Sequence, residues 1–444
     1  MISTRSRKIL LFSGMAALLI GVGFLQSWSL ALAIVNLCII SAIMSLGVNM
    51  QWGYAGLFNA GVMGFAALGG LAAIVIGMPP VQETWQVGGL GILISFLIIV
   101  VTIFASVLAY RQLVRVDPLV GGIAALVVAV IGILVARVFF LPATEAIELV
   151  EPAKTGYLGG VGLHILVAWP VGGLFAAGAA WVVGKVALGL RADYLAIATL
   201  GISEIIVAIM KNEDWLTRGV KNVTGLPRPT PYEVDLQNTT WFTSLANDWG
   251  LGVVEASSIY VKLCYAGLFL TVLLIVLFLS ERALKSPWGR MMRAIRDNED
   301  AAEAMGKDVK GRHLEVFILG SAVIGIAGAM LTTLDGQFTP VTYQPLRFTF
   351  LIWVMVIVGG SGNNFGAVLG GFLVWFAWIE AEPVGAWLID VVTAGLADDN
   401  ALRLHLLDSA SYMRPITMGL VLLLVLRFSP KGLIPEESGA TRSK

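Results

Sequence analysis

The chain has little charge, two cysteines and three histidines, and each scarcity excludes a class of protein. Only 13% of its 444 residues are charged, roughly half the share of about 25% found in soluble domains. Because 29 basic residues balance 29 acidic ones, the composition indicates no nucleic-acid partner. Cys38 and Cys264 form neither a disulfide framework nor a zinc-binding spacing. His164, His313 and His405 are scattered along the chain, which argues against a metal site.

Recognisable catalytic motifs are also missing from the sequence. It contains no Gly-x-Ser-x-Gly elbow, no His-Glu-x-x-His pair and no Gly-x-x-x-x-Gly-Lys-Ser/Thr phosphate loop. We therefore expect a protein that is not an enzyme and that has no cofactor and no metal of its own. If ATP drives its function, ATP and Mg²⁺ bind to a separate subunit.

Apolar residues dominate the chain, at 57% with a mean hydropathy of +0.85. They gather in runs of about 20 residues, the length of a helix that crosses a membrane. We predict an all-α polytopic membrane protein with about 10–12 transmembrane or re-entrant helices. The candidate spans are 9–27, 29–48, 57–77, 88–110, 119–141, 161–184, 193–210, 260–280, 313–334, 346–359, 364–380 and 413–429. Because the first apolar stretch continues to Val48 without a polar start, we interpret it as two retained helices rather than a cleaved signal peptide.

Basic residues concentrate on one side of the predicted membrane. With the N-terminus inside, the cytoplasmic segments contain Arg111, Arg115, Lys185, Arg191, the loop 281–311, Arg427 and Lys431. The positive-inside rule then places both termini in the cytoplasm, at a bacterial inner membrane. We predict a single transmembrane domain, 1–444, with a cytoplasmic loop at 281–311 and long extracytoplasmic loops at 211–259 and 381–412.

Two glycine-rich stretches interrupt the apolar pattern. The region 346–380 reads as two short apolar halves separated by Gly359–Asn364, and a loosely similar stretch begins at Gly56. Both can be irregular helix segments whose free backbone groups face a cavity, as in transporters. Close helix packing through small residues is the alternative. Under the first interpretation, the substrate pathway includes Asn59, Gly61, Gly362 and Asn363.

Glu204 lies in an otherwise apolar predicted helix, where a carboxylate needs a physical reason. It can be a buried residue that forms a hydrogen bond or an ion pair. It can lie at one end of the span, where a charge costs little. It can also line the substrate pathway. The sequence leaves these three interpretations open, and we include Glu204 among the candidate pathway residues.

The cytoplasmic loop 281–311 reads as two short helices. Pro287 suits the first turn of the first helix. Met291, Met292 and Ile295 are spaced so that they can lie on one face of it. Arg290, Arg293 and Arg296 form a second stripe. A loop that rests on anionic lipid headgroups would by itself explain the arginines.

Lipid headgroups do not explain the second helix of this loop. Asp297 or Asn298 can cap it, its first turn is acidic, and Gly306 can end it. The helix is rich in alanine and lies next to the amphipathic one. A short amphipathic element held below the membrane can insert into a groove on a cytoplasmic partner, and we expect such a partner to dock here.

Several blocks of the sequence resemble the branched-chain amino-acid and urea permease family of ABC transporters, and most closely its LivM-type members. The coupling loop of that family is similar to Ser286–Arg290, Ala294–Arg296, Asp300–Ala302 and Met305–Gly306. Further blocks are Gln51–Gly61, Tyr194–Ile206, Thr224–Pro229, Val358–Gly366 and Lys431–Glu436. Because the blocks occur in family order and cover most of the chain, they are specific as a set.

The resemblance implies the permease subunit of an ATP-driven importer for branched-chain or other neutral amino acids, which works by alternating access. It also implies the partners: a second permease subunit of related sequence, two ATPase subunits, an extracytoplasmic solute-binding protein and membrane lipid. ATP-driven closure of the ATPase pair would act on the loop 286–311. The residues expected to couple to the ATPase are Arg290, Arg293, Arg296, Ala302, Glu303, Ala304 and Gly306.

Two segments depart from the family pattern. The region 112–150 looks like an added helical pair, and 381–412 is longer than the family leads us to expect. A urea or short-amide permease of the same architecture is the alternative function. A stand-alone secondary transporter or channel is the alternative of another class, but it requires ion-coupling carboxylates within the spans and leaves the cytoplasmic loop unexplained.

Overall fold

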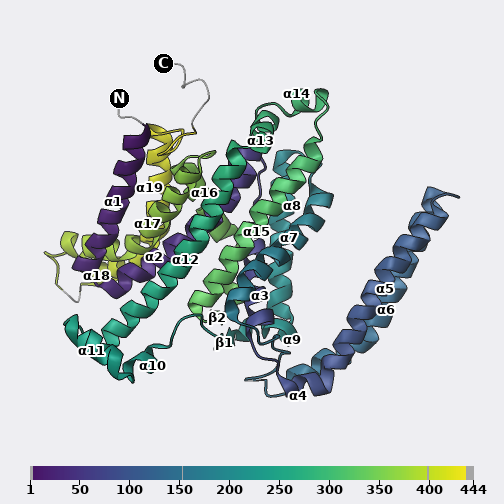
Figure 1. Cartoon of the computed structure of the whole chain (residues 1–444), viewed down its shortest axis with the longest axis horizontal. Helices are drawn as coiled ribbons and strands as arrows, with labels where there is room; N and C mark the ends of the chain where they lie inside the picture. The colour runs from purple at the N-terminus through teal and green to yellow at the C-terminus, as the bar shows by residue number, and fades with distance from the viewer. Residues whose placement is uncertain (1–3, 153, 398–399, 437–444) are drawn as a thin grey trace.

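The computed structural model describes residues 4–152, 154–397 and 400–436 (Figure 1). Within these residues, ten helical spans are long and apolar enough to cross a membrane. They contain α1 (Thr4–Leu25), α2 (Trp28–Val48), α5 (Leu90–Leu113), α6 (Pro118–Leu149), α7 (Ala168–Ala187), α8 (Ala192–Asn212), α12 (Val253–Lys285), α15 (Val309–Asp335), α17 (Asn364–Val392), and α18 (Ala401–Asp408) with α19 (Met413–Phe428). Two shorter apolar helices, α3 (Val62–Gly77) and α16 (Pro345–Gly359), accompany them.

These helices confirm the predicted all-α polytopic membrane protein, while some of their bounds differ from the prediction. Helix α12 begins at Val253, inside the predicted loop 211–259. Helix α17 continues to Val392 through Pro383, inside the predicted loop 381–412. Hydropathy marks only the part of a helix that lies in hydrocarbon. Polar residues such as Glu255 continue the helix into the aqueous interface without a hydropathic signal.

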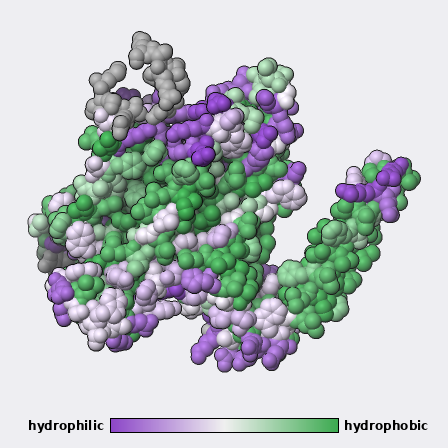
Figure 2. Space-filling view, viewed as in Figure 1, coloured by the Kyte–Doolittle hydropathy of each residue, from purple (hydrophilic) through white to green (hydrophobic). Residues whose placement is uncertain are grey.

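The two ends of the bundle carry different structures (Figure 1). Helices α13 (Pro287–Asp297) and α14 (Glu299–Ala304) project from the end of the bundle at which α1 begins and α19 ends. The opposite end carries α9 (Asp214–Thr217), α10 (Glu233–Gln237), α11 (Thr240–Asp248), α18 and the two-stranded sheet of β1 (Val223–Thr224) and β2 (Gln337–Phe338). An apolar band separates the two polar ends in Figure 2. The start of α1 and the end of α19 therefore share one side with α13 and α14, and the basic loop assigns that side to the cytoplasm.

The centre of the bundle is built from α2, α3, α7 and α15, which approach one another through small residues. A Cβ atom on Gly69 of α3 would overlap the backbone carbonyl of Gly325 in α15. One on Gly328 would likewise overlap the backbone of Ala66. Because lipid supplies no hydrophobic driving force between apolar helices, close backbone approach and dispersion have to hold them together. The glycines thus fix the position of α3, which follows the first interruption of the helices.

A hairpin of α5 and α6 stands apart from the rest of the bundle (Figure 1). Its second helix, α6, fills nearly all of the segment 112–150, so this segment is one helix paired with α5 and not the added helical pair that was predicted. At its base, Ile92 and Ile147 are buried against Trp215 of α9. Nε1 of Trp85 donates a hydrogen bond to the carbonyl oxygen of Leu158 at 3.0 Å. Above this anchored base both helices expose apolar side chains along most of their length.

Candidate functional site: a network at the cytoplasmic end

The first helix interruption begins where α2 widens into the π-helical turn η1 (Asn49–Tyr54), and ends where α3 starts at Val62. Backbone groups freed by such a break need polar partners inside the protein. The side chain of Gln51 links the break to a neighbouring helix, because its Nε2 donates hydrogen bonds to the carbonyl oxygen of Phe317 and to Oγ of Ser321, each at 3.0 Å. The break is thereby fastened to α15.

Asn59 and Gly61, two of the predicted pathway residues, lie within this break. The Asn59 side chain is fully buried; its Nδ2 donates to Oε1 of Gln51 at 2.9 Å, and its Oδ1 accepts from the Gly61 amide at 2.8 Å. The Asn59 carbonyl accepts a hydrogen bond from Nε1 of Trp353 at 3.0 Å. Thr199 of α8 accepts from the amide of Ala60 through its hydroxyl. These contacts hold the shape of the break, so Asn59 has a structural role and does not face open space.

The second interruption separates α16 from α17 at residues 360–363. Oδ1 of Asn363 caps α17 by accepting from the amides of Phe365 and Gly366, at 3.0 and 3.2 Å. Nδ2 of Asn363 donates to the carbonyl oxygen of Pro435 at 3.0 Å. The amide of Ile434 also donates to the carbonyl oxygen of Gly359 at 2.8 Å. The segment 432–436, which we call the C-terminal strap, therefore lies directly on the second break.

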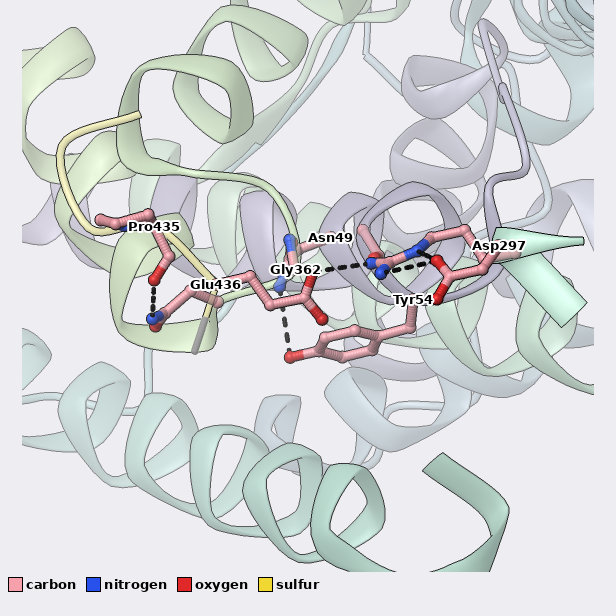
Figure 3. A network of polar contacts seen from close by, with 9 residues as sticks. Asn49, Tyr54, Asp297, Gly362, Pro435 and Glu436 are labelled. Atoms are coloured by element: carbon pink, nitrogen blue, oxygen red, sulfur yellow. Dashed lines mark hydrogen bonds and ion pairs between the residues drawn. The ribbon is translucent and has the colours of Figure 1, made fainter. Parts of the chain in front are cut away.

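The two breaks, more than 300 residues apart in sequence, contact each other (Figure 3). The amide of Gly362, at a φ of 78° that favours glycine, donates to Oδ1 of Asn49 at 2.9 Å. Nδ2 of Asn49 donates to Oδ1 of Asn364 at 3.2 Å, and the Tyr54 hydroxyl donates to the same oxygen. Nδ2 of Asn364 donates in turn to Oε1 of Glu281 at the end of α12. A single buried polar cluster thus joins both breaks to the start of the cytoplasmic loop.

Arg296 ties this cluster to the cytoplasmic loop. Ser286 caps α13 by accepting from the Gly289 amide, and Met292 and Ile295 are buried at 0% and 1% exposure. Nη1 of Arg296 donates to the backbone carbonyl of Gly53 in the first break and lies 3.0 Å from Oε2 of Glu436 in the strap. A single guanidinium therefore connects α13, the first break and the strap, and Figure 3 shows Glu436 beside Gly362.

The remaining predicted coupling residues differ in exposure. Arg290 is exposed and Arg293 half-buried, whereas Ala302 lies partly against the core. Oδ1 of Asn298 caps α14 by accepting from the amide of Ala301 at 2.9 Å. The other α14 residues singled out in the sequence, Glu303 and Ala304, and Gly306 after them, are exposed. Met305 is 80% exposed at this tip, an apolar side chain displayed to the cytoplasm.

Glu204 takes a position that removes two of its three interpretations. It lies near the middle of α8, away from either end of the span. Its side chain is exposed on the outer face, and within the described part of the chain it has no hydrogen-bond or ion-pair partner. The opposite face of α8 packs on the first break, where Ser203 contacts Gly64. A carboxylate at this depth costs about 2.5–3.5 kcal/mol when lipid surrounds it. A polar environment, and not lipid, must therefore lie against this face of α8.

Sequence reasoning missed several residues of the cluster. Asn49, Tyr54 and Asn364 are fully or almost fully buried, and Glu281 completes the set. A signal was available, because Asn49 and Asn364 are amides at the ends of long apolar runs, where polar side chains need partners. Glu436 belongs to a block that resembles the permease family, but its partner could not be read from the sequence.

Within the described residues, ten helical spans long and apolar enough to cross a membrane, two helix breaks that meet and a pair of cytoplasmic helices define a multi-pass membrane protein of the transporter class. The family model of the branched-chain amino acid transport system permease component matches residues 121–426. The chain belongs to this family. The family consists of transport subunits of the inner membrane rather than enzymes.

Individual relatives agree with the family assignment. The chain is 32% identical over 216 residues to the high-affinity branched-chain amino acid transport system permease protein LivM of Escherichia coli. This match covers 48% of the present chain and 50% of the relative. The match thus spans about half the length of that relative. A probable LivM of Methanocaldococcus jannaschii is 24% identical over 404 residues, covering 89% and 90% of the two chains. A probable LivH permease of the same organism is 31% identical over 123 residues, covering 28% of this chain and 35% of the relative. No solved structure matches the chain.

Proposed function

We propose that this chain is the transmembrane permease subunit of an ATP-driven importer for branched-chain or other neutral amino acids. The observation that carries the proposal is the position of Arg296, whose one guanidinium contacts both Gly53 and Glu436. A cytoplasmic helix pair that served only as a lipid anchor would need no link to a helix break and to the strap on the other break. An element that passes movement from a partner into the membrane needs such a link.

Movement enters through the exposed end of α14. We propose that an ATPase subunit binds Met305, Glu303 and the Gly306 turn, and that ATP and Mg²⁺ stay on that subunit. When the two ATPase subunits close, α13 moves with α14, and Arg296 transmits the displacement to the first break. Because Asn49 and Gly362 join the two breaks, both shift together and expose the substrate pathway alternately to each side.

Three further partners belong to the proposal. Similarity to a LivH permease over part of the chain supports a related second permease subunit. The exposed face of α8 with Glu204 is the surface that such a subunit, or a polar pathway between two subunits, would cover. A solute-binding protein would deliver the substrate at the extracytoplasmic elements α10, α11 and α18.

The proposal is tested by reconstituting the chain with its candidate second permease and ATPase subunits in liposomes. In the presence of the binding protein and internal ATP, we expect accumulation of radiolabelled leucine, inhibited by excess isoleucine or alanine but not by urea. Inhibition by urea alone would replace the substrate class with urea or short amides. Uptake that continues without ATP, or with an ATPase-dead partner, would overturn the importer in favour of a secondary transporter or channel.

A further inference from the structure

A cavity of about 330 Å³ lies between α2, α3, α15, α16, α17 and α19, on the extracytoplasmic side of the two helix breaks. This volume is at the lower end of the range of about 300–1,000 Å³ typical of small-molecule sites. Most of the lining is apolar, and its side chains include Ile40, Leu331, Phe348, Ile352 and Trp378. Two short hydroxyl side chains, Ser41 and Thr342, also line the cavity.

Two opposite charges face the same cavity. Asp335 ends α15 and lines the cavity, where its side chain is accessible although protein surrounds it on most sides. Arg414, near the start of α19, lines the cavity as well. Its Nη2 lies 2.5 Å from Oε2 of Glu382, so this nitrogen of the guanidinium already has an anionic partner. A charge that lines an apolar cavity in a membrane protein is costly unless a partner of opposite charge binds there.

Two hydrogen-bond donors in the cavity lining have no acceptor. Nε of Arg414 and Nε1 of Trp375 are buried atoms without a hydrogen-bond partner among the described residues. Buried donors are almost always paired. Both atoms are covered in this structure, so a small side-chain movement has to open them to the cavity before a bound molecule can accept from them. Nearby, the Tyr343 hydroxyl pairs with Oγ1 of Thr332 at 2.6 Å, and burial raises the pKa of Tyr343, so that this group stays neutral.

From this lining we infer that the cavity binds the substrate itself, as a zwitterionic amino acid with an apolar side chain. Asp335 receives the ammonium group, Arg414 and Trp375 donate to the carboxylate, and the aliphatic and aromatic side chains enclose the rest. The inference deepens the proposed function and rests on it, because it names the site within this subunit at which the imported amino acid is held. A lipid acyl chain could fill the apolar part but would leave Asp335 and both orphan donors unmatched.

The floor of the cavity connects this site to the cytoplasmic network. Met44, Met63 and Met355 line the cavity. Each lies within a few residues of an interrupted segment: Met44 precedes η1, Met63 follows the first break, and Met355 precedes the second. Methionine adapts its shape readily to a moving neighbour. A shift of the two breaks thus moves the floor of the binding site directly.

Protection from a thiol reagent tests the site without depending on transport. Thr342→Cys is introduced in a chain whose Cys38 and Cys264 are replaced by Ala, and the full assembly is treated with a water-soluble methanethiosulfonate reagent. Millimolar leucine should slow labelling roughly tenfold, and Asp335→Asn or Arg414→Gln should abolish this protection. Val341→Cys is the matched control, because Val341 is exposed next to Thr342 but does not line the cavity; leucine should leave its labelling unchanged.

Uptake measurements separate this inference from the proposed function. Asp335→Asn and Arg414→Gln should lower the maximum rate of leucine uptake roughly tenfold or more. Asp390→Asn, in an ion pair with Arg403 outside the cavity, is the control. If wild-type assemblies import leucine but leucine gives no protection at Thr342→Cys, the cavity holds lipid or solvent and the inference is wrong. If wild-type assemblies import no amino acid, the proposed function itself fails.

Discussion

Nη1 of Arg296 lies 3.0 Å from Oε2 of Glu436, so a cytoplasmic helix and the C-terminal strap are bound through one ion pair. Both side chains are about one-quarter exposed, and a pair of this kind contributes about 0–1 kcal/mol to stability. The ion pair therefore contributes little to stability, and its role is to hold the two segments together. The same guanidinium contacts the carbonyl of Gly53, which makes Arg296 the only described residue that joins α13, the first break and the strap through side-chain contacts.

Removing the charge of the strap should uncouple transport while leaving the protein folded. In Glu436→Gln, the Arg296 side chain keeps Asp297 but loses its ion pair with the strap, so the strap no longer follows α13. We expect leucine uptake per ATP hydrolysed to fall several-fold, with a thermal midpoint close to wild type because the pair is worth at most about 1 kcal/mol. Lys221→Gln, which removes a surface pair with Asp214 at the opposite end of the bundle, is the control. Unchanged coupling in Glu436→Gln would show that the strap is passive.

The contact between the two breaks requires glycine at position 53. A Cβ atom there would lie 2.5 Å from the amide nitrogen of Gly362 and closer still to Oδ1 of Asn49. Gly53→Ala should therefore destabilise the protein by about 1–3 kcal/mol, as overpacking does, and lower its thermal midpoint in detergent. Gly267→Ala, in α12 with nothing within 4 Å of the added methyl group, should raise stability slightly, by about 0.5–1 kcal/mol. Equal midpoints for the two variants would contradict the close contact.

The turn at Gly306 has room for a side chain, but it should tolerate only residues that can adopt its positive φ. Its φ is 76°, and a Cβ atom would meet nothing within 4 Å. Gly306→Val should distort the tip of α14 and uncouple uptake from ATP hydrolysis, whereas Gly306→Asn should keep most coupling because asparagine tolerates this region. Both variants should insert normally into the membrane. A valine variant as well coupled as wild type would remove Gly306 from the proposed contact.

Replacing the exposed charges beside this turn tests the same interface by another route. Glu303→Ala with Arg293→Ala should weaken binding of the ATPase subunits, measured by how much of them co-purifies with the chain. Because neither side chain is fully buried, the fold should be unaffected. Lys310→Ala, exposed at the start of α15, serves as the control, and full retention of the ATPase by the double variant would place the contact elsewhere.

Asn59→Leu should affect the fold more than substrate choice. The substitution leaves Oε1 of Gln51 and the amide of Gly61 without their partners inside the protein, at a cost of about 1–3 kcal/mol for each unsatisfied group. We expect a lower thermal midpoint and less inserted protein, with an unchanged ratio of leucine to alanine uptake in the fraction that survives. Asn212→Leu, at the exposed end of α8, is the control. A changed uptake ratio with normal stability would return Asn59 to the pathway.

Much of the fold could be predicted because a helix that lies in lipid has to be a long apolar segment, which the sequence shows directly. A segment of about 20 apolar residues has to satisfy its backbone internally, so helix number, order and sidedness follow from hydropathy and basic residues. The capped helices of the cytoplasmic loop were also predictable, since Ser286, Asn298 and Gly306 act on neighbours in sequence. The extension of α17 to Val392 was not, because hydropathy does not mark a helix that leaves the bilayer.

The candidate sites were predictable only in part. Arg296 belongs to an arginine stripe in the sequence, yet it turns inward to Gly53 while Arg290 remains exposed. Asp335 and Arg414 are isolated charges at the ends of different apolar runs, and periodicity gives no reason to associate them. They share a cavity only because α15 and α19 pack around the same space.

The sequence by itself determined that this is a helical membrane protein whose basic loop forms two short capped helices, because helix formation, capping and membrane insertion depend on residues close together in the chain. Only the tertiary structure decided that Asn49 meets Gly362, that Arg296 meets Glu436 and that Asp335 and Arg414 face one cavity. These contacts join residues distant in sequence, and they depend on how closely glycine-containing helices approach one another, which no local pattern specifies.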